Sequence, residues 1–165
     1  MEQVNQSNNF FNLISKYIRH INQNVREISL KIFIELAHLY YDNFENYIGN
    51  IFNFSAQIIN NDVENNKILC MKIWATLGIE EDSRLNENNR KQSLGFLQKY
   101  YDELSELCLK FIVTDDYDNE EHNVSLESYH LISIMSRVCN NNFLDKMLDY
   151  ISESINNPNH SEKIK

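Results

Sequence analysis

Residues that end helices and form tight turns are nearly missing from this chain. Its 165 residues include one proline and three glycines. Both residue types are frequent in turns and at strand edges, so their scarcity predicts a succession of helices. With 42% hydrophobic and 12% aromatic residues, the chain can bury a substantial core. We therefore expect an all-α protein.

The charge balance limits which partners the chain can bind. The formal net charge is −9, from 24 acidic and 15 basic side chains. This field would repel nucleic acids and anionic membranes and attract a basic partner. The sequence contains no apolar run of membrane-spanning length, and residues 2–9 (EQVNQSNN) do not resemble a signal peptide. We expect a soluble intracellular protein with no nucleic-acid or membrane partner.

Two kinds of amphipathic helix alternate along the sequence. Helices of the first kind carry apolar residues at spacings of three and four, as in residues 44–59 and 97–112, with shorter versions in 10–21 and 143–155. Helices of the second kind share the offsets 0, 5, 8 and 11: Val25, Leu30, Phe33 and Leu36; Val63, Ile68, Met71 and Trp74; Val124, Tyr129, Ile132 and Met135. Because Val25 and Val63 are 38 residues apart and follow the same kind of helix, we interpret the pattern as an internal repeat.

Antiparallel helix pairs that recur near this spacing are typical of HEAT repeats, which complete their core by stacking. The predicted fold is all-α, an α-solenoid of HEAT repeats and a segment of a longer superhelix, with an irregular helical bundle as the alternative. We expect a flexible N-terminus (1–9), a HEAT-repeat segment (10–155) and a flexible C-terminus (156–165). The segment divides into repeats at about 10–42, 43–79 and 94–139 and a helix at 141–155. Residues 78–93 are expected to form a mobile loop between repeats.

Short polar residues precede the second-kind helices and can cap them: Asn22, Asn24, Asn60, Asp62 and Asn123. Three residues separate the paired helices in the first two repeats, but eleven separate Ile112 from Val124.

The longer third connection lies within the stretch VTDDYDNEEHNV and contains five carboxylates and no Lys or Arg: Asp115, Asp116, Asp118, Glu120 and Glu121. Insertions in repeat proteins often lie on the binding face. We expect this acidic loop to dock a basic protein surface through charge-assisted hydrogen bonds.

The loop has two alternative interpretations. The first is a solvated loop without a partner. The second is a calcium loop, because Asp116, Asp118, Glu120 and Glu127 fall at positions 1, 3, 5 and 12 of an EF-hand. Position 6 of that motif needs glycine for a sharp turn, and Glu121 stands there. This mismatch argues against calcium.

The remaining reactive residues form no recognisable centre. Cys70, Cys108 and Cys139 lie in apolar stretches, without a paired C-x-x-C or a histidine at ligand spacing, so they are expected to be buried free thiols. No arrangement of Ser, His and Asp suggests an active site. We expect no enzymatic activity, no cofactor and no metal site.

Three features of the sequence match, in order, the consecutive elements of one repeat-protein family. VREISLKIFIELAHLYYDNFENYIGNIF (Val25–Phe52) is similar to the family's Val-Arg, Leu-Tyr-Tyr and Tyr-Met-Gly pattern, with Tyr47-Ile48-Gly49 at the last element. KIWATLGIEED, centred on Trp74, resembles the family's Trp-containing helix. The acidic insertion falls where the family has its acidic loop. Together the three features resemble the importin-beta (karyopherin-beta) family around its sixth to eighth HEAT repeats, over roughly residues 10–155.

This resemblance implies a nuclear import receptor of the cytoplasm, the nucleus and the nuclear pore. Expected partners are Ran-GTP, basic cargo or an importin-alpha-type adaptor, and Phe-Gly nucleoporins. The five loop carboxylates would contact the basic partners, although His122 replaces the family's Trp. Phe10 and Phe11 are candidate Phe-Gly contacts, with plain packing as the alternative. The alternative function is a structural HEAT scaffold of the phosphatase or coat-subunit type.

Overall fold

The computed structural model describes residues 2–86, 92–112, 123–139, 145–150 and 152, with the backbone alone for residues 2–9. Its elements are α1 (Glu2–Tyr17), α2 (Gln23–Leu39), the 3₁₀ helix η1 (Tyr41–Asn46), α3 (Ile48–Asn61), α4 (Glu64–Asn86), α5 (Phe96–Lys99), α6 (Tyr101–Ile112) and α7 (Val124–Val138). Residues 145–150 are also helical, and these ranges contain no strand. The predicted all-α class is confirmed.

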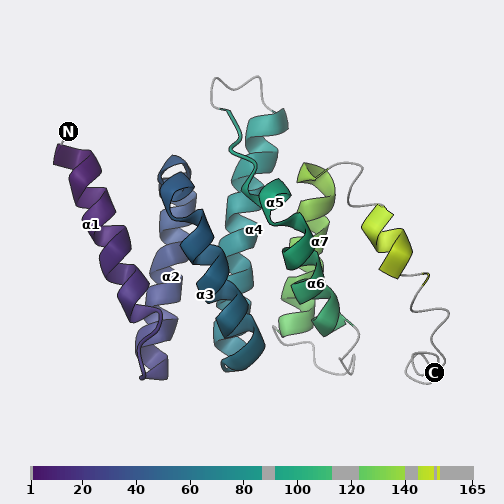
Figure 1. The fold of residues 1–165 in the computed structure, drawn as a ribbon, viewed down its shortest axis with the longest axis horizontal. Helices are drawn as coiled ribbons and strands as arrows, with labels where there is room; N and C mark the ends of the chain where they lie inside the picture. Colours follow the sequence, from purple (N-terminus) through teal and green to yellow (C-terminus); the bar gives the residue numbers. More distant parts are fainter. Residues whose placement is uncertain (1, 87–91, 113–122, 140–144, 151, 153–165) are drawn as a thin grey trace.

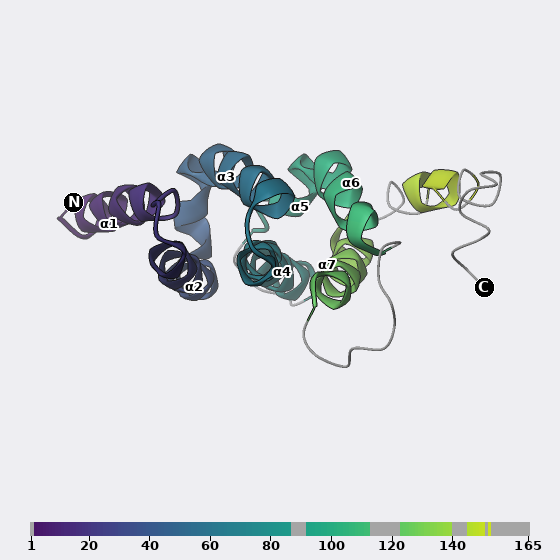
Figure 2. The same cartoon turned by 90° about the horizontal axis from the view of Figure 1, so that it is seen from below.

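The helices form antiparallel pairs that stack side by side (Figure 1). Seen from below, α1, α3 and α6 form one row and α2, α4 and α7 form a second row (Figure 2). We call these the first layer and the second layer. The pairs are α1–α2, α3–α4 and α6–α7, as the alternation of helix types predicts. The stack is an α-solenoid and not an irregular bundle.

Helix α4 is the centre of the stack, since it packs against α2, α3 and α7. A helix covered on several sides must be apolar around most of its circumference. Accordingly, Cys70, Met71, Ile73, Trp74 and Leu77 are all fully buried. The Trp74 ring contacts the rings of Phe52 on α3 and of Tyr100 just before α6. These contacts link the second helix pair to the third.

Gly78 permits a close approach between α4 and its neighbours. A Cβ atom at this position would lie 2.5 Å from side-chain carbons of both Ile134 and Leu97. Both distances are far below van der Waals contact. This glycine therefore serves helix packing and does not form a turn.

Two of the expected capping residues cap second-layer helices, Asn22 at α2 and Asn123 at α7. Asn22 accepts a hydrogen bond from the Asn24 N–H group, and Asn123 accepts one from the Leu126 N–H group. Asp62 accepts from the N–H group of Val63 just before α4. The side chain of Asn60 instead donates to the Ala56 carbonyl within α3.

The expected mobile loop at residues 78–93 is wrong for its first half, because α4 continues to Asn86. The polar residues of GIEEDSRLN suggested a loop, but two of them face inward. Glu81 is 1% exposed and Arg84 is 7% exposed. Both side chains have polar partners in the connections before and after the α3–α4 pair. These partners offset the cost of burying charged groups.

Glu81 holds the segment that enters α5. Its carboxylate accepts hydrogen bonds from the Phe96 and Leu97 N–H groups and from the Tyr41 hydroxyl at 2.9 Å. The same hydroxyl accepts from the Leu94 N–H group at 2.9 Å. Burial raises the pKa of Glu81, and these hydrogen bonds oppose that rise by stabilising the charged form.

Arg84 makes a second tie one turn further along α4. Its guanidinium forms two hydrogen bonds with the Asp42 carboxylate, at 2.6 and 3.2 Å, and one with Glu80 at 2.9 Å. It also donates to the Gln92 carbonyl at 3.0 Å and lies over the Tyr41 ring. Glu81 and Arg84 thus fix η1 and residues 92–97 against α4.

Other sequence expectations concern the two termini and α7. Residues 2–9 belong to α1, and no helix-breaking residue stands among them; their expected flexibility stays a prediction. On α7, Val124 and Met135 are buried and Ile132 is partly buried, as the predicted register requires. Tyr129 is exposed instead, while Ser128, Leu131 and Ile134 are buried. The predicted helix at 141–155 is described only at residues 145–150 and 152, and residues 156–165 lie outside the described part.

The Tyr41 hydroxyl supports a testable prediction. Replacing Tyr41 with Phe removes the donor to the buried Glu81 carboxylate and the acceptor for Leu94, so the free energy of unfolding should fall by about 1–3 kcal/mol. Urea unfolding measures this change. Tyr40→Phe is the matched control, because the Tyr40 side chain is half exposed. Equal stabilities for the two variants would contradict the proposed role of the hydroxyl.

Candidate partner-binding surface

The five acidic-loop carboxylates, Asp115, Asp116, Asp118, Glu120 and Glu121, lie outside the described residues. The structure does describe the two ends of this connection. Helix α6 ends at Ile112, and Asn123 caps the start of α7. In Figure 1 these ends lie at the same edge of the stack as the turns between α1 and α2 and between α3 and α4. We call this the turn edge.

Both ends of the acidic connection contact the start of α4. Glu64 accepts a hydrogen bond from the Val124 N–H group at 3.4 Å. On the other side, the Lys67 ammonium lies 5.4 Å from the centre of the Phe111 ring. These two contacts tie the third turn of the edge to the second helix pair.

The first and second turns are joined by a bidentate ion pair. The Arg26 guanidinium donates to both Asp62 carboxylate oxygens at 2.7 Å, and it also donates to the carbonyls of His20 and Ile21. Asp62 accepts from Val63 and Asn66 as well. The hydrogen bonds from Arg26 are the largest cause that lowers the pKa of Asp62.

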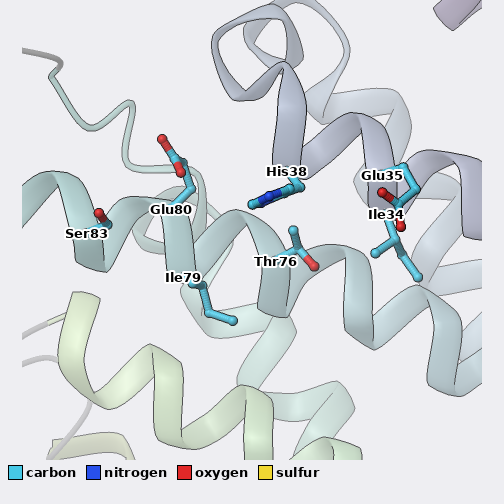
Figure 3. Close-up of a pocket in the computed structure, with 7 residues that line it drawn as sticks. All are labelled: Ile34, Glu35, His38, Thr76, Ile79, Glu80 and Ser83. Atoms are coloured by element: carbon cyan, nitrogen blue, oxygen red, sulfur yellow. The ribbon is translucent and has the colours of Figure 1, made fainter.

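A cavity of about 540 Å³ opens between α2 and α4 in the second layer. Its lining combines the carboxylates of Glu35 and Glu80, the His38 imidazole, two hydroxyls and two apolar side chains, and consists of Ile34, Glu35, His38, Thr76, Ile79, Glu80 and Ser83. Figure 3 shows His38 reaching from α2 toward Thr76 on α4, with Glu80 and Ser83 further along α4.

The chemistry of this cavity suits a cationic side chain. Carboxylates and hydroxyls accept hydrogen bonds from Lys and Arg, while isoleucines cover the apolar stem of such a side chain. No Lys or Arg appears in the lining that the structure describes. Arg84, which is buried and outside this lining, pairs with Glu80 at 2.9 Å and with Asp42 at 2.6 Å. The charge of Glu80 is therefore partly compensated by Arg84, which Glu80 shares with Asp42.

Sequence reasoning missed the cavity. Its residues belong to the polar sides of two amphipathic helices, and such sides usually face only solvent. Glu35 and His38, and likewise Thr76 and Glu80, are spaced so that each pair shares a helix face. Only the packing of α2 beside α4 brings the two faces together.

The two candidate Phe-Gly contacts have different environments. Phe11 is 1% exposed and stacks on Tyr47 with a ring separation of 4.9 Å, so its ring belongs to the core. Phe10 is 43% exposed. Helix periodicity places adjacent residues on different faces, which explains why the two rings diverge. Phe10 alone of the pair can present its ring to a partner.

The three cysteines are buried free thiols, as predicted. Burial raises the pKa of Cys108 and of Cys139 to about 12, which disfavours the reactive thiolate. Across the described ranges, no group of three or more His, Cys, Asp or Glu side chains could hold a metal ion. Within those ranges, no helix has the length and apolar composition needed to cross a bilayer.

The sequence and the fold of this chain are both similar to those of the same kind of protein. No protein-family model matches the chain. Importin subunit beta-1 of Schizosaccharomyces pombe is 23% identical over 142 residues, which cover 79% of this chain and 16% of that protein. Importin subunit beta-1 of Arabidopsis thaliana is 22% identical over 153 residues, covering 84% of this chain and 17% of that protein.

The fold matches solved importin-beta structures. Yeast importin-beta (Kap95p) aligns with a TM-score of 0.84 over 93% of this chain and 19% of its own, at 14% identity. The chain resembles importin-beta. The predicted resemblance and the predicted HEAT solenoid are therefore confirmed, over less than one fifth of the length of these relatives. The importin-beta-like chain is also similar to Kap95p in a structure with RanGDP and in a Kap95:Nup1 complex.

The Arg26–Asp62 pair gives a prediction for the turn edge. At neutral pH, Asp62→Asn should lower the free energy of unfolding by about 1–2 kcal/mol. Because folding lowers the pKa of Asp62, its contribution is present above the ordinary carboxyl pKa of about 4 and is lost as the pH falls below that value. The difference between the native chain and the variant should therefore shrink in acid.

Unfolding curves in urea at several pH values measure this difference. Asp102→Asn is the control, since Asp102 also forms an ion pair but its side chain is 74% exposed. Such exposed pairs contribute little. An Asp62→Asn effect no larger than that of Asp102→Asn would show that the pair does not stabilise the edge.

Proposed function

We propose that the chain supplies a partner-binding region of a nuclear import receptor. Its acidic loop and the cavity between α2 and α4 would engage Ran-GTP and a basic cargo or the basic segment of an importin-alpha-type adaptor. The observation that carries the proposal is the cavity, where Glu35 and Glu80 face an opening whose described lining contains no Lys or Arg.

The net charge and the acidic insertion support the same conclusion. A chain of formal charge −9 attracts a basic protein over a long range, and charges at the docking site then fix its orientation. The five loop carboxylates, Asp115, Asp116, Asp118, Glu120 and Glu121, would bind the partner at the turn edge. The ties from Glu64 and Lys67 would hold the two ends of the loop in place.

Comparison with Kap95p favours these partners. The fold of this chain matches Kap95p in a structure with RanGDP, with a TM-score of 0.84 over 96% of the chain. It also matches Kap95 in a complex with Nup1. The match covers 19% of those chains. We propose a receptor role shared between the cytoplasm, the nucleus and the pore, without enzymatic activity.

Contact with Phe-Gly nucleoporins is proposed at Phe10 alone, since Phe11 is buried. Phe10→Ser removes an exposed ring, so it should weaken binding of a Phe-Gly peptide several-fold while leaving the unfolding midpoint unchanged. Fluorescence anisotropy with a labelled peptide checks this. Unchanged peptide affinity would assign Phe10 to packing only.

A structural HEAT scaffold of the phosphatase or coat-subunit type remains the alternative function, because the same fold serves unrelated roles. Salt-sensitive binding of basic ligands distinguishes the two. A receptor region should bind Ran-GTP or a Lys/Arg-rich helical peptide at low salt and release it as salt rises. A scaffold of this kind should bind neither.

The main prediction concerns charge in the cavity and in the loop. Glu35→Gln with Glu80→Gln should lower the affinity for the basic peptide about tenfold at about 50 mM salt, because two acceptors lose their charge. Neutralising the five loop carboxylates should lower it as much or more. Isothermal titration calorimetry measures both effects.

The matched control is Glu45→Gln with Glu103→Gln, which removes the same charge from two exposed residues that do not line the cavity. This control should bind nearly as well as the native chain. Equal losses of peptide affinity in the control and in the cavity variant would show that the effect depends only on net charge. Failure of the native chain to bind Ran-GTP and the peptide at low salt would contradict the proposed function.

A further inference from the structure

Ser93 differs from the other serines and threonines that the structure describes. In the described part of the chain, all the others lie in helices, whereas residues 92–95 have no regular secondary structure. Ser93 is partly exposed, and Gln92 and Leu94 on either side of it are exposed. A protein kinase must hold the acceptor hydroxyl in line with the γ-phosphate of ATP. A serine inside a helix would first have to unfold locally to reach that position, and Ser93 avoids this cost.

The residues around Ser93 indicate which class of kinase would recognise it. The sequence reads Arg90-Lys91-Gln92-Ser93-Leu94, with two cations three and two positions before the hydroxyl and an apolar residue directly after it. Basophilic kinases bind an arginine at this distance with carboxylates of their own. Arg90 and Lys91 lie outside the described residues, so their contribution rests on the sequence alone. Leu94 is 36% exposed, which leaves its side chain partly available to the kinase.

Ser29 shows that the sequence pattern does not decide by itself. Ser29 follows Arg26 by three positions and precedes Leu30, so it also has an arginine and an apolar residue at these distances. However, it is 4% exposed within α2, and its hydroxyl donates to the Val25 carbonyl at 2.7 Å. Arg26 is itself paired with Asp62. The fold therefore withholds both parts of the pattern at Ser29.

We propose that Ser93 is a phosphorylation site for a basophilic serine/threonine kinase, and that its phosphate loosens residues 92–97 from α4. The Ser93 Oγ would form a bond to the γ-phosphorus of ATP while the bond from that phosphorus to the β,γ-bridging oxygen breaks. ADP leaves, and the hydroxyl proton passes to the catalytic carboxylate of the kinase. The inference does not depend on the proposed import function.

The phosphate would stand between two contacts that hold this segment. On one side of Ser93, Arg84 donates to the Gln92 carbonyl at 3.0 Å. On the other side, the Leu94 N–H group donates to the Tyr41 hydroxyl at 2.9 Å. A change of charge at Ser93 therefore acts on both contacts at once.

The charges that take part in these contacts are unfavourable for a phosphate. Phosphoserine carries a charge of roughly −1.5 to −2 at neutral pH. Three carboxylates belong to the same network, because Asp42 and Glu80 pair with Arg84 and Glu81 accepts from the Tyr41 hydroxyl. The guanidinium of Arg84 is already shared between two of them. Repulsion between like charges should therefore weaken the hydrogen bonds that hold residues 92–97.

Phosphorylation of the folded chain tests the site. The chain is incubated with magnesium-ATP and the catalytic subunit of cyclic-AMP-dependent protein kinase, and phosphopeptides are identified by mass spectrometry. We expect phosphate at Ser93 and none at Ser29. Ser93→Ala should remove the modification, and Arg90→Ala with Lys91→Ala should slow it about tenfold because the kinase loses both cations. No phosphate at Ser93, or as much at Ser29, would overturn the proposal.

Hydrogen exchange of the phosphorylated chain tests the loosening. The amides of Leu94, Phe96 and Leu97 should exchange about fivefold faster than in the unmodified chain, because these N–H groups donate to the contacts that the phosphate weakens. Exchange along α2 should be unchanged, and treatment with a phosphatase should restore the slow exchange. Unchanged exchange, or slower exchange through capture of the phosphate by Arg84, would overturn the proposed effect.

Discussion

The burial of α4 against α2, α3 and α7 is the contact on which the rest of the structure depends. In stacked repeats of this kind, a helix pair buries its apolar sides against its neighbours. Trp74, Met71 and Ile73 of α4 are fully buried, and Trp74 contacts the rings of Phe52 and Tyr100. Gly78 lets α7 and α5 approach closely enough to complete that packing. Stability in such a stack comes mainly from contacts between neighbours.

The polar contacts determine where the connections lie. At one edge, Arg26 joins the first turn to Asp62 in the second, and Glu64 bonds to the start of α7. At the other edge, Glu81 and Arg84 bind η1 and the segment that enters α5. These ion pairs and hydrogen bonds add modest stability individually. Their main consequence is geometric, because they hold the ends of the acidic connection and the walls of the α2–α4 cavity in fixed places.

The helix pairs were predictable from the sequence because periodicity and the lack of proline and glycine report directly on helices. On α7, Val124 and Met135 were predicted correctly, but Tyr129 was not, since Tyr129 and Leu131 are both apolar and only packing decides which one is buried. Glu81 and Arg84 suggested a loop because charged residues are rarely buried, and their partners at Tyr41 and Asp42 are about 40 residues away in the chain. The cavity was not predictable either, because the sequence does not show that the polar faces of α2 and α4 meet. The acidic loop is evident from composition, and the role of its carboxylates stays a prediction.

In the proposed function, the α2–α4 cavity in the second layer and the acidic loop at the turn edge bind the same basic partner. The most direct measurement is hydrogen exchange of the native chain with and without a Lys/Arg-rich helical peptide at low salt. We expect slower exchange in the peptides that carry Glu35 and His38, in those that carry Thr76 and Glu80, and in the α6–α7 connection, with no change along α1. Protection confined to α1, or no protection at all, would contradict it.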